Sequence, residues 1–302
     1  SGVMNTPGFL LSAWRLGAYE GFGHLRSQVI ALIGQFGPRV IERDQDCDLI
    51  GGSAGMILIL AMILEDGGPP CEPIIEMLGD HLLRHVTQQH GGPSWKVGAS
   101  PIALCGLGHG SAGIALSLMK AWKITGREDF RTCALAAIAC EHRLRNEEKM
   151  NWPDLRLATD LNDIDSVTSS NGAWCFGYPG IAVARAAVLE IEDDPIARSD
   201  FEFAMEAFRV NPLTRPMGRP HLCCGSFGIL EIHRTIGVRM GIQSELELAS
   251  EQLKTCVQIQ NDRGTSIGCM GQGLFQGLMG QAWATIAVEG KVPNVGEILI
   301  LS

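Results

Sequence analysis

Apolar segments recur along the chain, and each of them follows a turn of small residues. Five turns of the form Gly-x-x-Gly carry this signature, with second glycines 48 to 67 residues apart: Gly52–Gly55, Gly110–Gly113, Gly177–Gly180, Gly225–Gly228 and Gly277–Gly280. A degenerate sixth turn spans Asn5 to Gly8. The segments that follow lack a clear polar face, as expected for buried helices: Phe9–Trp14, Met56–Leu64, Ile114–Trp122, Ile181–Leu189, Ile229–Ile236 and Gln281–Val288.

More polar, amphipathic stretches lie between the apolar ones and are predicted to be outer helices: Pro73–Gln89, Asp129–Arg145, Ile196–Val210 and Ser244–Ile259. The first has Pro73 in its first turn, where helices tolerate proline. The last opens with Ser244 and Glu247 at the spacing of a capping box. The β-branched alternation typical of strands is scarce. We therefore predict an all-α fold, an α/α toroid of inner and outer helices, with an open helical solenoid as the alternative.

One stretch breaks the repeat. Residues 146–172 are rich in Asp and Asn and contain the dipeptide Trp152-Pro153. A loop of this length beside a site is often functional, and mobility is the other interpretation. Because no other stretch resembles a linker, we treat residues 1–302 as one domain.

Composition narrows the class of protein. Hydrophobic residues make up 46% of the 302 positions and charged residues 19%, so a sizeable core can be buried. The net charge of −9 argues against nucleic acid or anionic lipid as a partner. The longest apolar run, Met56–Leu64, is too short to span a membrane, and no secretory signal is recognised. Ten cysteines without a regular ladder of spacings favour a reducing cytoplasm, with some thiols bound to metal.

The positions just before the turns carry the candidate chemistry. Cys175 stands two residues before a turn glycine, as Cys223 does, and Cys224 follows Cys223 directly. In a toroid, the same position in each repeat faces the same mouth of the cavity, so these cysteines are predicted to meet. Three thiolates plus one open position are typical of a catalytic zinc site. His109 occupies the position of Cys224 in another repeat, which leaves an active-site role and a structural role open.

The remaining candidates have less support. Asp48 lies four residues before the first turn, where it could cap a helix or project into the cavity. His81 and His85 are four apart on a predicted outer helix, and we interpret them as a solvated face because no third ligand is near them in the sequence. The other cysteines are interpreted as small buried hydrophobes, with the last of this list as a reserve ligand: Cys47, Cys71, Cys105, Cys133, Cys140, Cys256 and Cys269.

The motifs resemble those of the LanC-like family, the lanthipeptide cyclases and their relatives. The resemblance runs from Asp48 to the C-terminus and rests on Trp174-Cys175-x-Gly-x-Pro-Gly and on Cys-(His/Cys)-Gly, here Cys223-Cys224-Gly225. It implies an α/α toroid of seven inner and seven outer helices. The details most resemble the C-terminal cyclase domain of class II lanthipeptide synthetases (LanM). We therefore expect residues 1–302 to be part of a longer synthetase, with the first hairpin of a seven-repeat ring and a dehydratase domain lying before Ser1.

The resemblance also implies roles for individual residues. Cys175, Cys223 and Cys224 would bind Zn²⁺, and His109 and Asp48 would be the general acid and base candidates. The implied reaction adds peptide cysteine thiolates to dehydroalanine or dehydrobutyrine, forming (methyl)lanthionine thioether rings. The partner would be a dehydrated precursor peptide, leader plus core.

Two departures from the family pattern matter. Most members have histidine at the position of Cys224, and the Cys-Cys-Gly variant resembles a three-cysteine subgroup of substrate-tolerant synthetases. Phe176 stands where relatives commonly carry His or Tyr, so a polar helper is absent there. Two other functions remain open: a LanC-like enzyme that adds glutathione to dehydrated residues, and a non-catalytic, zinc-stabilised toroid that binds peptides.

Overall fold

The computed structural model describes residues 6–160, 164–211, 221–263, 275–280 and 282–283. Within these ranges the main elements, in chain order, are α1 (Thr6–Leu16), α2 (His24–Arg43), α3 (Ser53–Glu65), α4 (Glu72–Arg84), β1 (Thr87–Gln89), β2 (Gly92–Ser94), α5 (Ser111–Thr125), α6 (Glu128–His142), the 3₁₀ turn η1 (Leu155–Leu157), α7 (Gly177–Leu189), α8 (Pro195–Val210), α9 (Ser226–Met240) and α10 (Gln243–Arg263).

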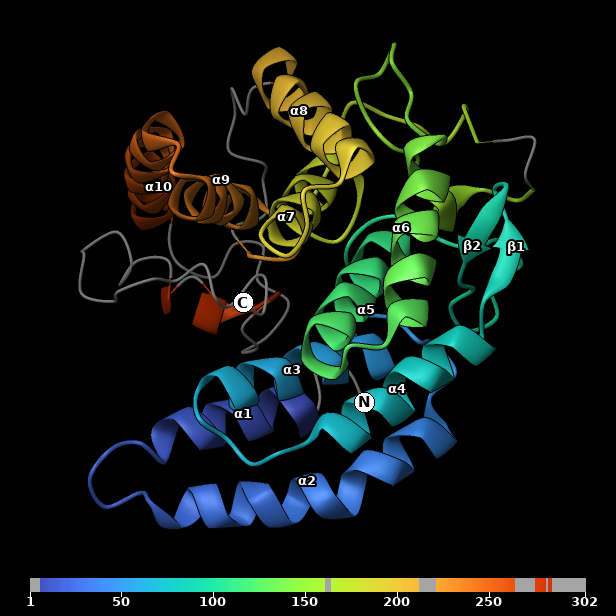
Figure 1. Cartoon of the computed structure of the whole chain (residues 1–302). Helices are drawn as coiled ribbons and strands as arrows, with labels where there is room; N and C mark the ends of the chain where they lie inside the picture. Colours follow the sequence, from blue (N-terminus) through green and yellow to red (C-terminus); the bar gives the residue numbers. More distant parts are fainter. Residues whose placement is uncertain (1–5, 161–163, 212–220, 264–274, 281, 284–302) are drawn as a thin grey trace.

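The helices follow one another in pairs around an arc (Figure 1). Helices α1, α3, α5, α7 and α9 form an inner layer in which each helix packs against the next. Each inner helix also packs against the helix that follows it in the chain, and these partners, α2, α4, α6, α8 and α10, lie on the outside. This is the layered arrangement of an α/α toroid, so the predicted fold class is confirmed.

Burial explains why the inner helices carry no polar face. In α3 every residue from Ser53 to Ile63 is buried, and in α7 every residue from Gly177 to Val188 is buried. Helix α8, by contrast, buries one stripe and begins with a cap in which the Asp194 side chain accepts the N–H groups of Ile196 and Ala197. Inner helices are enclosed by their neighbours on both sides, whereas outer helices keep one face in solvent.

In three of the turns the second glycine lies against a carbonyl of the preceding loop. A Cβ at Gly113 would lie 2.1 Å from the Leu107 oxygen, and one at Gly180 would lie 2.2 Å from the Trp174 oxygen. Gly228 makes an equally close approach to its own loop. No side chain fits at these distances, so glycine is required for the close backbone approach. The repeated turn therefore folds the loop before each of these helices onto the helix's first turn.

Two elements were not predicted. Helix α2 forms although Pro38 lies in its interior, where proline removes one backbone hydrogen bond of the helix. The helix packs against α1 and α4. Helix α4 ends at Arg84, earlier than predicted, and a short antiparallel hairpin of β1 and β2 follows. Positive φ angles at His90 (55°) and Gly91 (81°) make the two-residue turn of this hairpin. In addition, α10 begins at Gln243, one residue before the predicted cap Ser244.

The predicted loop 146–172 is tied to the helices in its described part. The Asn151 Oδ1 accepts the N–H groups of Trp152 and Tyr178 at 2.9 and 2.7 Å, and its Nδ2 donates to the Ser169 carbonyl. The Trp152 ring is buried, and its Nε1 donates to the Glu141 carbonyl at 3.1 Å. These bonds fix the loop beside the start of α7, where one of the candidate cysteines lies.

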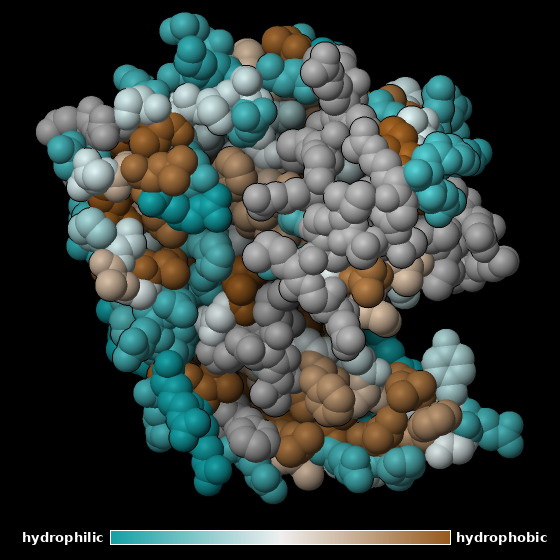
Figure 2. Space-filling model, turned by 180° about the vertical axis from the view of Figure 1, so that it is seen from behind, coloured by the Kyte–Doolittle hydropathy of each residue, from teal (hydrophilic) through white to brown (hydrophobic). Residues whose placement is uncertain are grey.

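Exposed large hydrophobic side chains gather at the first helical pair: Phe9, Leu16, Tyr19, Phe22 and Ile30. Figure 2 shows hydrophobic atoms along the lower part of the molecule, where Figure 1 places α1 and α2. Several exposed apolar side chains on one helical pair are typical of an interaction site. The expected additional hairpin before Ser1 stays a prediction. Among the described residues, no helix is both long and apolar enough to cross a lipid bilayer.

A buried carboxyl group lies in the inner layer. Glu231 of α9 is 0% exposed, and among the described residues neither of its carboxyl oxygens has a hydrogen-bond partner. The nearest opposite charge is the Arg234 guanidinium, 3.9 Å away. Burial therefore raises the pKa of Glu231 to about 7.

We expect Glu231→Gln to be more stable than the parent protein at pH 8. In the unfolded chain the carboxyl loses its proton near pH 4.5, but in the folded chain near pH 7. Between these values the folded state binds more protons, so stability falls as pH rises, by up to about 3 kcal/mol. Denaturant unfolding at pH 5 and pH 8 measures this. The exposed Glu202→Gln is the control, and an unchanged pH dependence in Glu231→Gln would contradict the prediction.

Candidate metal centre

Three sulfur atoms from two repeats lie together at the ends of α7 and α9. Cys175 lies two residues before α7, and Cys223 and Cys224 lie just before α9. The Cys224 Sγ is 3.6 Å from the Cys175 Sγ and 3.3 Å from the Cys223 Sγ, and all three lie within 4.8 Å of one another. Cys175 is buried and the other two are half-buried. The predicted convergence of these cysteines is confirmed.

Main-chain hydrogen bonds explain why the pre-helix loops come together. The Gly108 N–H donates to the Cys175 carbonyl at 3.0 Å, and the Trp174 N–H donates to the Cys223 carbonyl at 3.2 Å. The Cys223 N–H in turn donates to the Phe275 carbonyl at 3.0 Å. Each loop is thus bonded to the loop of the next repeat, which places equivalent positions side by side at one end of the inner helices.

The electrostatics of the cluster suit metal binding. Hydrogen bonds from the Cys175 and Cys223 thiols hold the pKa of Cys224 well below its usual range. The same contacts, together with burial, raise the pKa of Cys175 far above its usual range. The Cys224 sulfur therefore favours the deprotonated form, which is the form that binds metals. A cation can replace the shared protons, and a set of three close sulfur donors fits Zn²⁺.

His109 and Asp48 form a pair beside this cluster. The His109 Nδ1 lies 2.5 Å from the Asp48 Oδ2, and the other carboxylate oxygen accepts the Gly51 N–H at 2.6 Å. Asp48 is 1% exposed, whereas the His109 side chain is 35% exposed. The residue before His109 is the one bonded to the Cys175 carbonyl. The pairing leaves the His109 Nε2 as the ring nitrogen that is not bonded to Asp48, and Asp48 both accepts an N–H of the turn and contacts a neighbouring repeat.

Two polar neighbours of the cluster were not predicted from the sequence. Arg156, from the loop 146–172, lies over the Phe176 ring with its guanidinium carbon 4.8 Å from the centroid, and Asp154 binds it through both carboxylate oxygens at 2.7 Å. The His221 Nδ1 accepts the Cys224 N–H at 3.2 Å. The positive charge of the Arg156 guanidinium favours the Cys224 thiolate. Phe176, which stands where relatives commonly carry a polar residue, therefore contacts the Arg156 guanidinium.

The other predicted residues are placed as follows. Cys47, Cys71, Cys105, Cys140 and Cys256 are buried and Cys133 is half-buried, while Cys269 lies outside the described residues. The interpretation of the two α4 histidines as a solvated face is wrong for His81, which is 3% exposed. His85 is exposed, as expected.

Comparison with known proteins supports the same fold. The family model for lanthionine synthetase C-like proteins matches residues 23–294. Among solved structures, nisin cyclase is similar to this chain with a TM-score of 0.61 and 12% sequence identity, over 97% of this chain and 77% of that chain. At this identity the likeness shows the fold alone. No curated protein sequence matches significantly.

Proposed function

Because the chain belongs to the lanthionine synthetase C-like family, we propose that it is a zinc-dependent lanthipeptide cyclase. Its reaction would join a peptide cysteine to the β-carbon of dehydroalanine or dehydrobutyrine in the same peptide, giving a (methyl)lanthionine ring. The observation that carries the proposal is the meeting of three cysteine sulfurs at one end of the inner helices, bonded through the backbone to the loop of His109.

Cys175, Cys223 and Cys224 would hold the metal. A Zn²⁺ ion there would supply the positive charge that lowers the pKa of a substrate thiol and orients its sulfur. Three thiolate ligands donate more electron density than two thiolates and an imidazole, which favours a nucleophilic substrate sulfur. This supports the tolerance of varied substrates that the resemblance of the Cys223-Cys224-Gly225 motif implies.

His109 would move the proton. In the reaction a C–S bond forms at the β-carbon, the C=C electron pair moves toward the carbonyl to give an enolate, and the α-carbon then takes up a proton. The thiol loses one proton and the enolate gains one, so the exchange balances. An imidazole exchanges protons near neutral pH, and Asp48 fixes the His109 ring through Nδ1 at 2.5 Å. Asp48 would therefore orient the ring, leaving Nε2 to carry the proton.

The likeness of the Cys-Cys-Gly motif supports a finer assignment. We place this chain with the cyclase domains of class II synthetases, whose partner is a dehydratase domain of the same protein. The substrate would then be a precursor peptide, leader plus core, already dehydrated at serine or threonine. The apolar surface at α1 and α2 offers a place where such a partner could pack.

Cys175→Ala and Cys224→Ala are each expected to lower bound zinc by about one ion per chain, because two thiolates bind Zn²⁺ less tightly than three. Metal analysis of purified protein checks this. Cys133→Ala, which removes a half-buried thiol of α6, is the matched control. Unchanged zinc content in both site variants would exclude the cluster as a metal centre.

The class of reaction is tested with two dehydrated peptides, one containing cysteine and one lacking it, each incubated with glutathione. The cyclase proposal predicts that the first peptide loses alkylatable thiols without gaining mass and that the second stays unchanged. A glutathione adduct on the second peptide would favour the glutathione-adding function. Neither change, with metal retained, would favour a peptide-binding toroid.

A further inference from the structure

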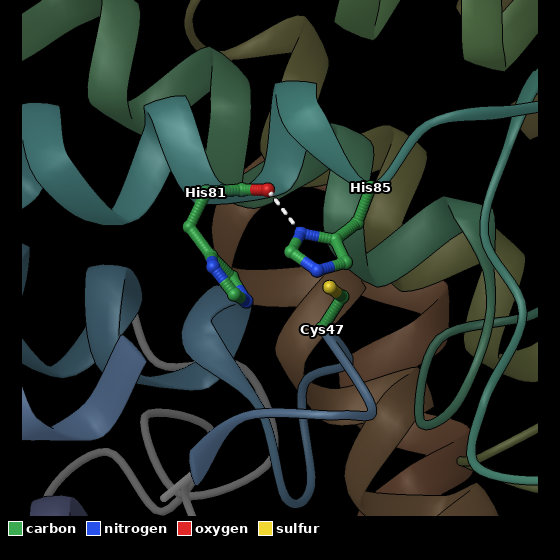
Figure 3. A group of neighbouring side chains, drawn as sticks. All are labelled: Cys47, His81 and His85. Carbon is green, nitrogen blue, oxygen red and sulfur yellow. Dashed lines mark hydrogen bonds between the residues drawn. The ribbon is translucent and has the colours of Figure 1, made fainter. Parts of the chain in front are cut away.

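A second group of metal-binding side chains lies outside the three-cysteine cluster. Cys47 belongs to the loop between α2 and α3, His81 lies in the last turn of α4, and His85 directly follows α4. One ligand atom from each of them lies within 4.8 Å of the others. Figure 3 shows the two histidines directed from α4 toward the sulfur of Cys47.

The hydrogen bonding of His85 leaves one ring nitrogen free for a ligand role. The His85 Nδ1 lies 2.8 Å from the His81 carbonyl oxygen, which can only accept, so Nδ1 carries the proton. The lone pair of the neutral ring is then on Nε2, and Figure 3 shows this edge of the ring facing Cys47. The two imidazole rings are 4.1 Å apart between centroids. A fixed tautomer of this kind is typical of metal-binding histidines.

His81 is a buried imidazole next to the buried acidic residue Asp44. It is 3% exposed, and among the described residues its Nε2 has no hydrogen bond. Burial, together with the neighbouring His85, lowers the pKa of His81 and favours the neutral ring that binds metals. The Asp44 carboxylate, which is also buried, lies 3.4 Å from this Nε2. A buried ring nitrogen that makes no hydrogen bond and lies beside a buried anion indicates a site for a cation.

We propose that Cys47, His81 and His85 bind a second divalent transition-metal ion of the Zn²⁺ class. One sulfur and two imidazole nitrogens suit such an ion. The ion would replace the proton of the Cys47 thiol, which is released to solvent. The Cys47 thiolate and the Asp44 carboxylate together balance its two positive charges. The metal would join the loop that carries Asp48, the residue after Cys47, to the outer helix α4, and so fix the carboxylate that holds His109.

Metal stoichiometry tests the proposal without any activity assay. The full chain, stripped by a chelator and titrated with Zn²⁺, is expected to bind about two ions per chain. His85→Ala is expected to bind about one, because it removes the exposed member of the group and leaves the core unchanged. His24→Ala, which removes an exposed histidine at the start of α2, should still bind about two. Two ions in His85→Ala, or a single ion in the parent protein that His85→Ala retains, would overturn the proposal.

Cobalt spectra identify the ligands independently. The Co²⁺ form of the parent protein minus that of His85→Ala is expected to show tetrahedral bands with a charge-transfer band from one thiolate. Cys47→Ala should lose the same bands, whereas Cys71→Ala, which removes another buried thiol near α4, should keep them. No thiolate band in the difference spectrum would refute Cys47 as a ligand. Cys175→Ala should lose the other ion only, so failure of the three-cysteine centre is distinguished from failure of this one.

Discussion

His109→Ala is expected to slow ring formation by about 10²–10⁴-fold, the usual contribution of a general acid–base group. The His109 ring is fixed by Asp48 at Nδ1, is partly open to solvent and follows the residue bonded to the Cys175 carbonyl. It is not one of the three clustered sulfur ligands, so the variant should keep its zinc and its fold. The measurement is the rate at which a dehydrated precursor loses alkylatable thiols, together with metal analysis.

His142→Ala is the matched control for this experiment. His142 also has its Nδ1 close to a buried carboxylate, that of Asp200 at 2.6 Å, and a similarly exposed side chain, but it ends the outer helix α6. It should keep the parent rate. If His109→Ala loses zinc, the histidine is a ligand and the three-cysteine centre is wrong. If it cyclises at the parent rate, His109 is structural and Asp48 becomes the better candidate.

Arg185→Met is expected to lower the free energy of unfolding by about 3–5 kcal/mol, the cost of breaking a buried ion pair. The Arg185 guanidinium on α7 is 0% exposed, donates to the Glu141 carboxylate at 2.6 Å and donates to the Asp200 carboxylate at 3.1 Å. Methionine fills much of the same volume but leaves two buried carboxylates without their cation. Denaturant unfolding near neutral pH measures the loss.

The same network supports the site, because the other Glu141 oxygen accepts the Gly106 N–H at 2.8 Å, three residues before His109. The control is Arg198→Met, which breaks the exposed pair with Asp193 and should cost less than about 1 kcal/mol. Equal losses for Arg185→Met and Arg198→Met would contradict the importance assigned to the buried network.

Local repetition made most of the fold predictable. A Gly-x-x-Gly turn followed by an apolar run predicted α3, α5, α7 and α9, because only glycine permits the backbone approach seen at Gly113 and Gly180. Helix α2 was not predicted: Pro38 in its interior is unfavourable for a helix, and α2 packs against α1 and α4. The β1–β2 hairpin was missed because two three-residue strands leave too little alternation to detect.

Site residues at equivalent positions of the repeat could be predicted from the sequence, whereas those at other positions could not. Cys175 and Cys223 share a repeat position and Cys224 follows Cys223 directly, and backbone bonds between successive loops bring them into contact. Cys47 and His81 are not at equivalent positions of the repeat, because one lies in a loop and the other in an outer helix. Their spacing therefore does not indicate that the two residues lie close together. Arg156 was missed for the same reason: it lies in an irregular loop outside the repeat, so its position in the sequence does not indicate that its guanidinium lies near the cysteines.

The central claim is that the three-cysteine cluster activates a peptide thiol for ring closure. The most direct test counts alkylatable thiols by mass in a dehydrated, cysteine-containing precursor after incubation with the parent protein and, in parallel, with Cys175→Ala. Thiols are expected to disappear without a change in peptide mass in the parent reaction and to persist with Cys175→Ala. Equal loss of thiols in the two reactions, or no loss with the zinc-loaded parent protein, would contradict it.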